Sequence, residues 1–253
     1  MVSFNAPSVK RRSFLAGVGS LGTLGTLRYA TREPATEIEV RFWLTEQAST
    51  YDIADLLAAH IEAALEYEFW DVDVSFGGVV PVDSEDGARP VRSGRWPMAV
   101  GSGATGIGSI DAAKDVNLLV TDGPMHTSPT GYAIPHVASV GGARHIAELE
   151  PPDQEADELP YSRPNLTIQV VIHEVGHTLG LRHEHGRTYV ANQATVSTPM
   201  MSAYAWDSSF DSAESRCGQE YTPPPHPDRK LTHRFSLCAE STLREYKGGV
   251  NLR

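Results

Sequence analysis

The sequence predicts an α+β fold, and three features of the chain support this prediction. Residues 37–46 alternate apolar and polar side chains with the two-residue period of a strand, and residues 72–76 repeat this alternation. Residues 50–68 and the stretch from Ile168 to Leu179 instead space their apolar side chains three or four residues apart, as in a helix with one buried side. The 253 residues suffice for one sizeable domain, which we expect to be divided by a cleft rather than into independent domains.

The first elements in the chain are a strand, a helix and a second strand. The first strand, residues 37–46, carries four inward-facing apolar side chains: Ile38, Val40, Phe42 and Leu44. In the helix at residues 50–68, Ser49 and Asp52 are suited to cap the N-terminus. Because the second strand follows this helix directly, we expect the two strands to be parallel neighbours with a right-handed connection.

The middle of the chain predicts loops followed by three strands. Residues 77–110 are rich in glycine, proline and polar residues, which favours loops and short edge segments. Their glycine run GSGATGIGS could alternatively cradle a phosphate, but it lacks the Lys-Ser/Thr ending of a P-loop. The apolar run at 115–122 predicts a central strand, and residues 130–142 predict a pair of short strands. Three histidines of this region have no metal-ligand spacing and are expected at the surface or in loops: His126, His136 and His145.

The most specific motif is HEVGHTLGLRHE, which begins at His173. Two histidines four residues apart lie on one face of a helix, so His173 and His177 can bind one metal ion with Glu174 beside it. Gly180 can adopt the left-handed conformation that ends a helix, and this would bring His183 to the ion as a third ligand. Three histidine ligands leave one position open for water, which is typical of a catalytic zinc ion.

In these residues the chain resembles the metzincin clan of zinc endopeptidases, whose signature HExxHxxGxxH precedes a methionine turn. Glu184 extends the match to HExxHxxGxxHE, the form of astacin-like members. The resemblance implies a metzincin-like fold with an upper lobe at about 36–182, built from a twisted mixed sheet and two helices, and the active-site helix at the cleft. It implies a smaller, mostly irregular lower lobe with a terminal helix at about 183–253. It also implies that a strand near 131–141 forms the rim of the cleft and pairs with an extended substrate.

The resemblance implies a zinc endopeptidase that acts on protein or peptide substrates. One Zn²⁺, held by His173, His177 and His183, would lower the pKa of its bound water toward ~7 and polarise the carbonyl group of the peptide bond. Glu174 would accept the proton of this water and pass it to the departing amine. Two other functions remain open: a zinc amidase acting on a small or cell-wall amide, and a non-catalytic binding module that keeps the site as a scaffold. The intact Glu174 argues against the binding module.

The methionine turn implied by the resemblance falls in the segment STPMMSAY, which follows His183 by fourteen residues or more. Such a turn places a thioether beneath the histidines as an apolar floor. Many members have one residue between this methionine and a tyrosine, whereas two residues separate Met201 from Tyr204. Met201 and Met200 are therefore both candidates for the floor. Tyr204 either reaches the metal site and assists catalysis or is a core residue.

The N-terminal residues 1–35 are interpreted as an export signal with a short linker. Arg11 and Arg12 precede Ser-Phe-Leu and a glycine-rich apolar stretch, which resembles a twin-arginine signal. This predicts a secreted protein that binds the twin-arginine translocase during export. The apolar run from Phe14 to Leu27 has fourteen residues, fewer than the roughly 20 that span a bilayer. Because no A-x-A cleavage site is evident, a retained membrane anchor is the alternative.

The charge distribution is strongly acidic beyond the signal. Residues 1–35 hold five basic residues and one acidic residue, and the rest of the chain holds 16 basic and 31 acidic residues, a net charge of -15. Nucleic acid is therefore not expected as a partner. Only four of the 21 basic residues are lysine, and an acidic, lysine-poor surface is similar to that of proteins from salt-loving archaea. An ordinary acidic secreted protein is the alternative. We expect a monomer.

The two cysteines, Cys217 and Cys238, both follow the histidine motif. In an exported chain such a pair favours one disulfide that closes the C-terminal region, with two buried thiols as the alternative. The proline- and serine-rich residues 207–236 predict coil, and residues 239–247 predict a short helix.

Overall fold

The computed structural model describes residues 32–126, 130–153, 158–201 and 228–249. The chain divides into two units at Pro34 and Ala35, and the fold below is that of the described residues of the second unit, Ala35–Arg253. None of the helices in the described ranges is both long and apolar enough to span a membrane.

Four residues of functional interest lie outside the described residues: Arg11, Arg12, Tyr204 and Cys217. The predicted export signal, the role of Tyr204 and the Cys217–Cys238 disulfide therefore stay predictions.

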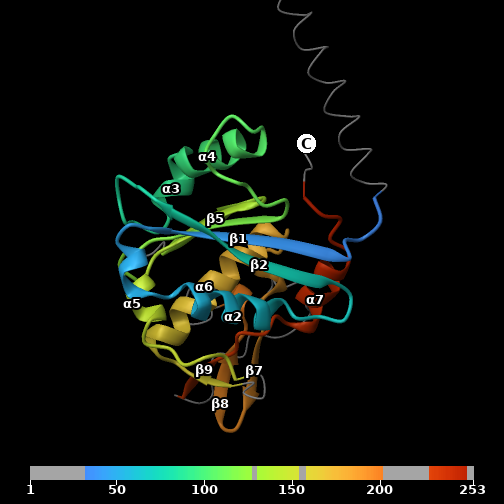
Figure 1. The fold of residues 1–253 in the computed structure, drawn as a ribbon. Coiled ribbons are helices and arrows are strands. Elements are labelled where there is room, and N and C mark those ends of the chain that lie inside the picture. Colours follow the sequence, from blue (N-terminus) through green and yellow to red (C-terminus); the bar gives the residue numbers. More distant parts are fainter. Residues whose placement is uncertain (1–31, 127–129, 154–157, 202–227, 250–253) are drawn as a thin grey trace, which may run out of the picture. The chain divides into compact units, whose positions relative to one another are not determined.

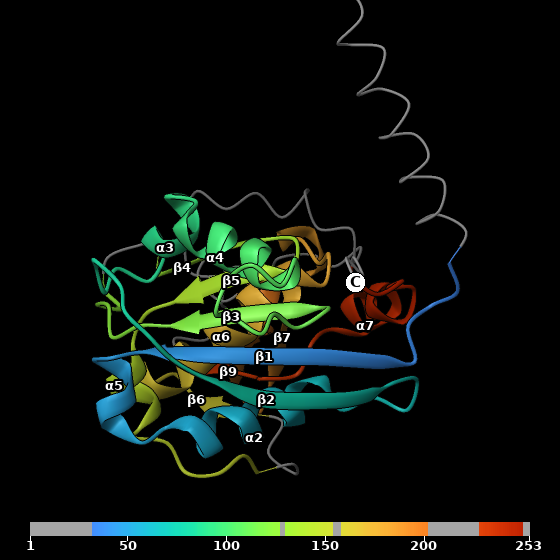
Figure 2. The ribbon, with the colours of Figure 1, turned by 45° about the horizontal axis from the view of Figure 1, so that its top comes forward.

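The larger sheet, seen in Figure 1, is mixed and has the strand order β2-β1-β3-β5-β4, which can be followed in Figure 2. Its strands are β1 (Glu37–Thr45), β2 (Asp71–Val80), β3 (Val116–Val120), β4 (Gly131–Ile134) and β5 (Val137–Val140). β1 runs parallel to β2 and β3, β3 runs parallel to β5, and β4 is antiparallel to β5. The predicted parallel pair, central strand and pair of short strands are thereby confirmed.

Helices cover both faces of this sheet (Figure 2). On one face, the buried side chains of Val40 and Phe42 pack in a core with α2 (Ala54–Leu65) and α6 (Arg163–Thr178). Trp43 points to the opposite face, as the alternation along a strand requires, and meets Trp96 of α4 (Arg95–Ala104) edge-on with ring centroids 5.1 Å apart. Two short helices complete the unit around this sheet: α3 (Arg89–Arg92) and α5 (Ala143–Ile146).

The prediction of loops for residues 77–110 is wrong in part, because β2 continues to Val80 and α3 and α4 follow it. Trp96, Val100 and Gly103 line the buried side of α4 at helical spacing. A Cβ atom at position 103 would lie 1.9 Å from the carbonyl oxygen of Ile110, so this glycine permits close packing rather than marking a loop. The glycine run also ends α4 instead of opening a helix, which argues against a phosphate cradle.

The helix predicted at residues 50–68 is shorter than expected. A 3₁₀ turn, η1 (Ala48–Tyr51), precedes it, and Asp52 has a left-handed conformation with φ 52°. α2 therefore begins at Ala54, and its N-cap residue Ile53 offers no side-chain hydrogen bond. The predicted cap by Ser49 and Asp52 is wrong because those residues belong to the preceding turn.

A second sheet with the order β6-β9-β8-β7 lies beyond α6 and was not predicted. Its strands are β6 (Leu159–Pro160), β7 (Thr188–Ala191), β8 (Ala194–Ser197) and β9 (Arg229–Leu231). β9 contradicts the predicted coil at residues 229–231. The predicted C-terminal helix is present as α7 (Leu237–Arg244), which Ser236 caps by accepting a hydrogen bond from the Ala239 amide. The two sheets and their helices confirm the α+β fold class.

Both ends of the second unit are held together by Asp115, which is fully buried before β3. Its carboxylate accepts hydrogen bonds from the Glu39 amide at 3.0 Å, the Tyr246 hydroxyl at 3.0 Å and the Gly249 amide at 2.6 Å. The Ala35 amide also donates to the Tyr246 carbonyl oxygen at 2.7 Å. The first strand and the residues after α7 are thus anchored to the same point.

Candidate metal centre

The helix α6 carries the first half of the candidate site. Ser162 caps it by accepting a hydrogen bond from the Asn165 amide. The predicted apolar stripe is confirmed, since all its members are at most 2% exposed: Ile168, Val171, Ile172, Val175 and Leu179. His173 and His177 lie one turn apart on α6, and His173 is 5% exposed.

Gly180 ends α6 in the predicted left-handed conformation, with φ 92°. Its amide donates to the His177 carbonyl oxygen at 3.1 Å, and the Leu181 amide donates to the Gly176 carbonyl oxygen at 2.9 Å. This pair of bonds is a Schellman motif. The space around position 180 is open, so the backbone conformation and not packing requires glycine here.

After this turn, His183 in η2 (His183–His185) returns toward α6. Each imidazole of His173, His177 and His183 offers a ring nitrogen, and these nitrogens all lie within 4.8 Å of one another. The rings of these three residues, the histidine triad, have centroid separations of 4.5, 4.9 and 5.2 Å. The structure thus brings together the three histidines that the sequence predicted as metal ligands.

Backbone carbonyl groups orient two of these rings. Nδ1 of His173 lies 2.7 Å from the Pro199 carbonyl oxygen, and Nδ1 of His177 lies 2.8 Å from that of Leu181. Because a carbonyl oxygen only accepts, each Nδ1 carries the proton and each Nε2 presents its lone pair to the site. Such an outer hydrogen bond is the usual support of a metal-binding histidine.

The triad is held in the neutral form that binds metals. Burial, reinforced by the neighbouring His177, lowers the pKa of His173 to about 3. Burial and His177 lower the pKa of His183 to about 4, and burial lowers the pKa of His177 as well. Neutral imidazoles avoid the competition between protons and a metal at neutral pH.

A zinc ion fits this donor set. Nε2 of His177 and Nε2 of His183 are 3.1 Å apart. Two nitrogen ligands of a tetrahedral zinc ion lie roughly 3.3 Å apart, given Zn–N bonds of about 2.0–2.1 Å. His173, His177 and His183 would therefore hold the ion. Cys238, in α7, is not part of this group of possible ligands.

Glu174 follows His173 on α6 and is 7% exposed. Among the described residues no group forms a hydrogen bond with its carboxylate. Burial raises the pKa of Glu174 to about 8 when only the protein groups act on it. A buried, unpaired carboxyl group beside a metal-ligand cluster is suited to accepting and releasing a proton near neutral pH.

Both methionines that are candidates for the floor of the site are buried in η3 (Pro199–Met201), where Met200 is 1% and Met201 is 2% exposed. A Cβ atom at Gly176 would lie 2.8 Å from Sδ of Met200, so Met200 packs against α6 at the position that directly precedes His177. Met201 instead packs against Gly186, where a Cβ atom would lie 2.6 Å from its Sδ. The geometry favours Met200 as the floor beneath the ligand helix.

Several supporting groups have no signal in the sequence. The carbonyl groups of Pro199 and Leu181 belong to the backbone, which every residue shares. Gln169 anchors α6 to the second sheet, since its Nε2 donates to the carbonyl oxygens of Ser197 at 2.7 Å and Thr232 at 2.9 Å. Gly176, the glycine within HEVGH, is the sequence feature from which close packing beneath α6 could have been predicted.

No protein-family model matches the chain, and no curated protein does. Among solved structures, the chain is similar to the crystal structure of a zinc-dependent peptidase from Methanocorpusculum labreanum. The sequence identity is 16%, the TM-score is 0.40, and the match covers 80% of this chain and 99% of the other. At this level of similarity, the function has to be argued from the residues of the chain itself.

Proposed function

We propose that the chain is a zinc-dependent endopeptidase. One observation carries the proposal: three neutral imidazoles converge on one point, and a buried carboxylate without a hydrogen-bond partner among the described residues adjoins them. Three histidine ligands are typical of a catalytic zinc site, because a structural site closes with four protein ligands.

Bound zinc supplies Lewis-acid chemistry that polarises a carbonyl group and makes water more acidic. The protein contributes the proton transfer. Glu174 accepts the proton of the attacking water as general base and delivers it to the departing amine as general acid, so that the carboxylate is regenerated. Its raised pKa, about 8 from burial, suits both directions of transfer.

The edge strand β4 supports an extended peptide as the substrate. β4 pairs with β5 on one side, and among the described residues no strand pairs with its other side. A peptide can add to such an edge as a further strand. Gly131 at the start of β4 contacts the Glu174 side chain, so a peptide bound along this edge would lie near the proposed general base.

The test combines metal analysis with one substitution. Purified protein should contain about one zinc ion per chain at the triad, and a chelator should abolish cleavage of denatured casein until zinc is restored. Glu174→Gln should retain this zinc and lose cleavage, since the carboxylate acts on the proton rather than on the metal. Glu62→Gln, an exposed change in α2, is the matched control and should cleave normally.

Full cleavage after exhaustive metal removal would sink the proposal. Hydrolysis of small amides by a protein that leaves denatured casein intact would instead favour an amidase, and metal binding without either activity would favour a binding module.

We also propose that the protein is secreted through the twin-arginine route. The paired Arg11 and Arg12 before an apolar stretch support this, and export of a folded chain would allow the metal site to form first. Replacing both arginines by lysine should retain the protein inside the cell; unchanged secretion of that double variant would contradict the assignment.

A further inference from the structure

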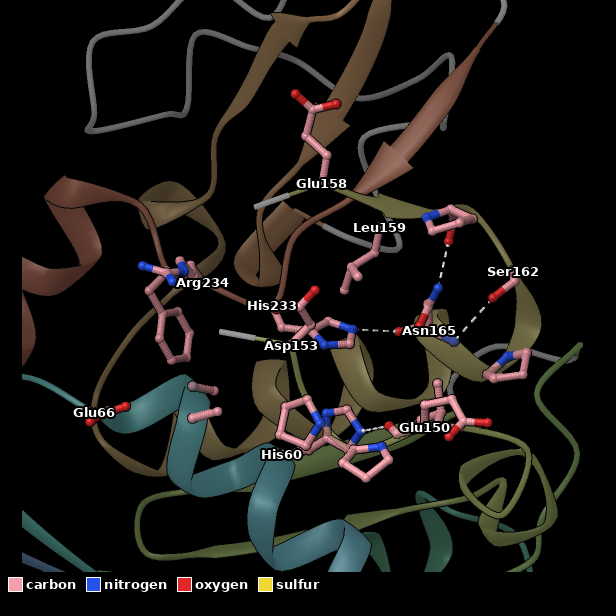
Figure 3. A pocket seen from close by; sticks show the side chains of 18 of the residues that line it. His60, Glu66, Glu150, Asp153, Glu158, Leu159, Ser162, Asn165, His233 and Arg234 are labelled. Carbon is pink, nitrogen blue, oxygen red and sulfur yellow. Dashed lines mark hydrogen bonds between the residues drawn. The ribbon is translucent and has the colours of Figure 1, made fainter. Parts of the chain in front are cut away.

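A cavity, the distal cavity, lies at the N-terminal end of α6, opposite to the end that carries His177. Its volume is about 1050 Å³. The walls come from α2, the segment before β6, the start of α6 and the chain between β9 and α7 (Figure 3). Segments from four separate parts of the sequence thus meet around it.

Two histidines lie next to each other in this cavity: His60 of α2 and His233, which follows β9. Their ring centroids are 5.7 Å apart and their planes are nearly perpendicular, at 82°. The triad rings have centroid separations of 4.5 to 5.2 Å. Two imidazoles on a tetrahedral zinc ion place their centroids roughly 5 Å apart, given Zn–N bonds of about 2.0–2.1 Å. The spacing of His60 and His233 is therefore close to that of ligands of one ion.

Both imidazoles are oriented by backbone carbonyl groups, as Figure 3 shows. Nε2 of His60 lies 3.1 Å from the Glu150 carbonyl oxygen, and Nε2 of His233 lies 3.1 Å from the Asn165 carbonyl oxygen. Each Nε2 must therefore carry the proton, which leaves Nδ1 with a free lone pair. Among the described residues no group forms a hydrogen bond with either Nδ1. The triad residue His173 is held in the same way, with the roles of its two nitrogens exchanged.

Both rings are also in the neutral form. His60 is 5% exposed, and burial lowers its pKa. Burial lowers the pKa of His233 to about 4, with a smaller contribution from His60. Each unprotonated Nδ1 therefore has a lone pair that is available to a metal ion.

The charge of the cavity wall favours a cation. The acidic residues that line it are Glu66, Glu148, Glu150, Asp153, Glu158 and Glu240. Arg234 is the sole arginine or lysine among the described lining residues. Glu158 is paired with Lys230 and Glu240 with Arg244, whereas no described group pairs with the exposed carboxylate of Glu150. A wall of this composition attracts positive ions and repels anions.

We propose that His60 and His233 form a second metal site, which binds a divalent transition-metal ion such as Zn²⁺. Nδ1 of each histidine is a ligand, and water completes the coordination. Imidazole nitrogen selects zinc, copper, nickel or cobalt over the hard ions Ca²⁺ and Mg²⁺, which require oxygen ligands. The ion joins α2 to the segment after β9 and so fastens the N-terminal end of α6 against the second sheet.

The experiment counts metal ions on the full chain. Metal-free protein is titrated with Co²⁺, whose visible spectrum reports its ligands, and then with Zn²⁺ in competition. Wild type should bind two equivalents, and His60→Gln and His233→Gln should each bind one. His145→Gln is the matched control, since His145 lies near the cavity and contacts Glu148, and it should keep two equivalents.

A second measurement isolates the distal cavity. In His177→Gln, which impairs the triad, Zn²⁺ should still raise the melting temperature because a ligand that binds only the folded state stabilises it. Adding His233→Gln to this variant should abolish the shift. His233 is less buried than His60, so this substitution keeps the test informative if His60→Gln fails to fold.

One equivalent in wild type, or two equivalents in His233→Gln, would overturn the second site. Neither result bears on the proposed peptidase function, which the casein assay and Glu174→Gln test separately.

Discussion

Gly131 of β4 lies directly against the carboxylate of Glu174 on α6. A Cβ atom at position 131 would lie 2.9 Å from both Cγ and Oε1 of Glu174. Because glycine has no side chain, Gly131 leaves room at the edge of the sheet for the carboxylate of Glu174, the proposed general base.

The substitution Gly131→Ala should displace this carboxylate while leaving the histidine triad intact. We expect kcat for peptide cleavage to fall at least about tenfold with unchanged zinc content, because small displacements of a catalytic group are costly. Steady-state kinetics and metal analysis measure the two effects. Gly101→Ala in α4 is the control, since position 101 has open space and no positive φ. Equal activity of both variants would show that Glu174 tolerates the added methyl group.

The two buried methionines should differ in their effect on the metal. Met200→Ala and Met201→Ala should each lower the unfolding free energy by about 2–4 kcal/mol, the usual cost of such a cavity. Only Met200→Ala should also weaken zinc binding, because Sδ of Met200 packs against α6 at Gly176, next to His177. Urea unfolding and zinc competition separate these effects. A weaker zinc affinity in Met201→Ala alone would reverse the assignment of the floor.

The ion pair between Asp122 and Arg144 should make stability depend on pH. Asp122 accepts hydrogen bonds from Arg144 and from the Tyr51 hydroxyl, and its side chain is 1% exposed. Burial alone would raise the pKa of this carboxyl group, but the bonds from Arg144 and Tyr51 outweigh burial and lower it. A carboxyl group with a lowered folded pKa adds stability above its unfolded value, about 3.9, and loses it as the pH falls through the folded value.

Arg144→Ala should therefore be less stable than wild type at pH 7 and lose less stability between pH 5 and pH 2. Urea unfolding at constant salt across this range measures both. Arg95→Ala, which removes an exposed pair with Asp83, should follow the wild-type curve. Parallel curves for wild type and Arg144→Ala would contradict the assignment of the acid-sensitive group.

Tyr204 is the remaining candidate for a catalytic role. If its hydroxyl hydrogen-bonds the carbonyl oxygen as negative charge develops there, losing this donor typically costs about 10²–10³ in turnover. Tyr204→Phe keeps the ring, so we expect kcat to fall at least about tenfold with little change in KM. Near-normal turnover of this variant would assign Tyr204 to the core.

Local patterns in the sequence were sufficient to predict the strands of the large sheet and the helix α6 that carries His173 and His177. Val40 and Phe42 alternate along β1, and the ligand spacing of His173 and His177 follows from the helical period alone. Gly180 could be predicted because a left-handed residue is needed to end α6 before His183.

The second sheet could not be predicted, since its pairing depends on partners far apart in the chain. β9 has three residues and pairs with β6 and β8, so its own sequence carries too little pattern to mark a strand. Gly101 and Gly103 made the sequence of α4 resemble that of a loop, although Gly103 permits close packing. His60 and His233 likewise meet only through the fold.

The three hydrogen bonds to Asp115 bear on when the protein can finish folding. Tyr246 and Gly249 emerge from the ribosome long after β1, yet they supply two of the three donors to this fully buried carboxylate. In a chain that is still being translated, the Glu39 amide is therefore the sole one of these three donors to Asp115. Burying a carboxylate that lacks hydrogen-bond donors raises the free energy of the folded state. The large sheet should thus complete its folding only after synthesis has passed residue 249. A nascent chain halted before that residue should remain susceptible to proteolysis.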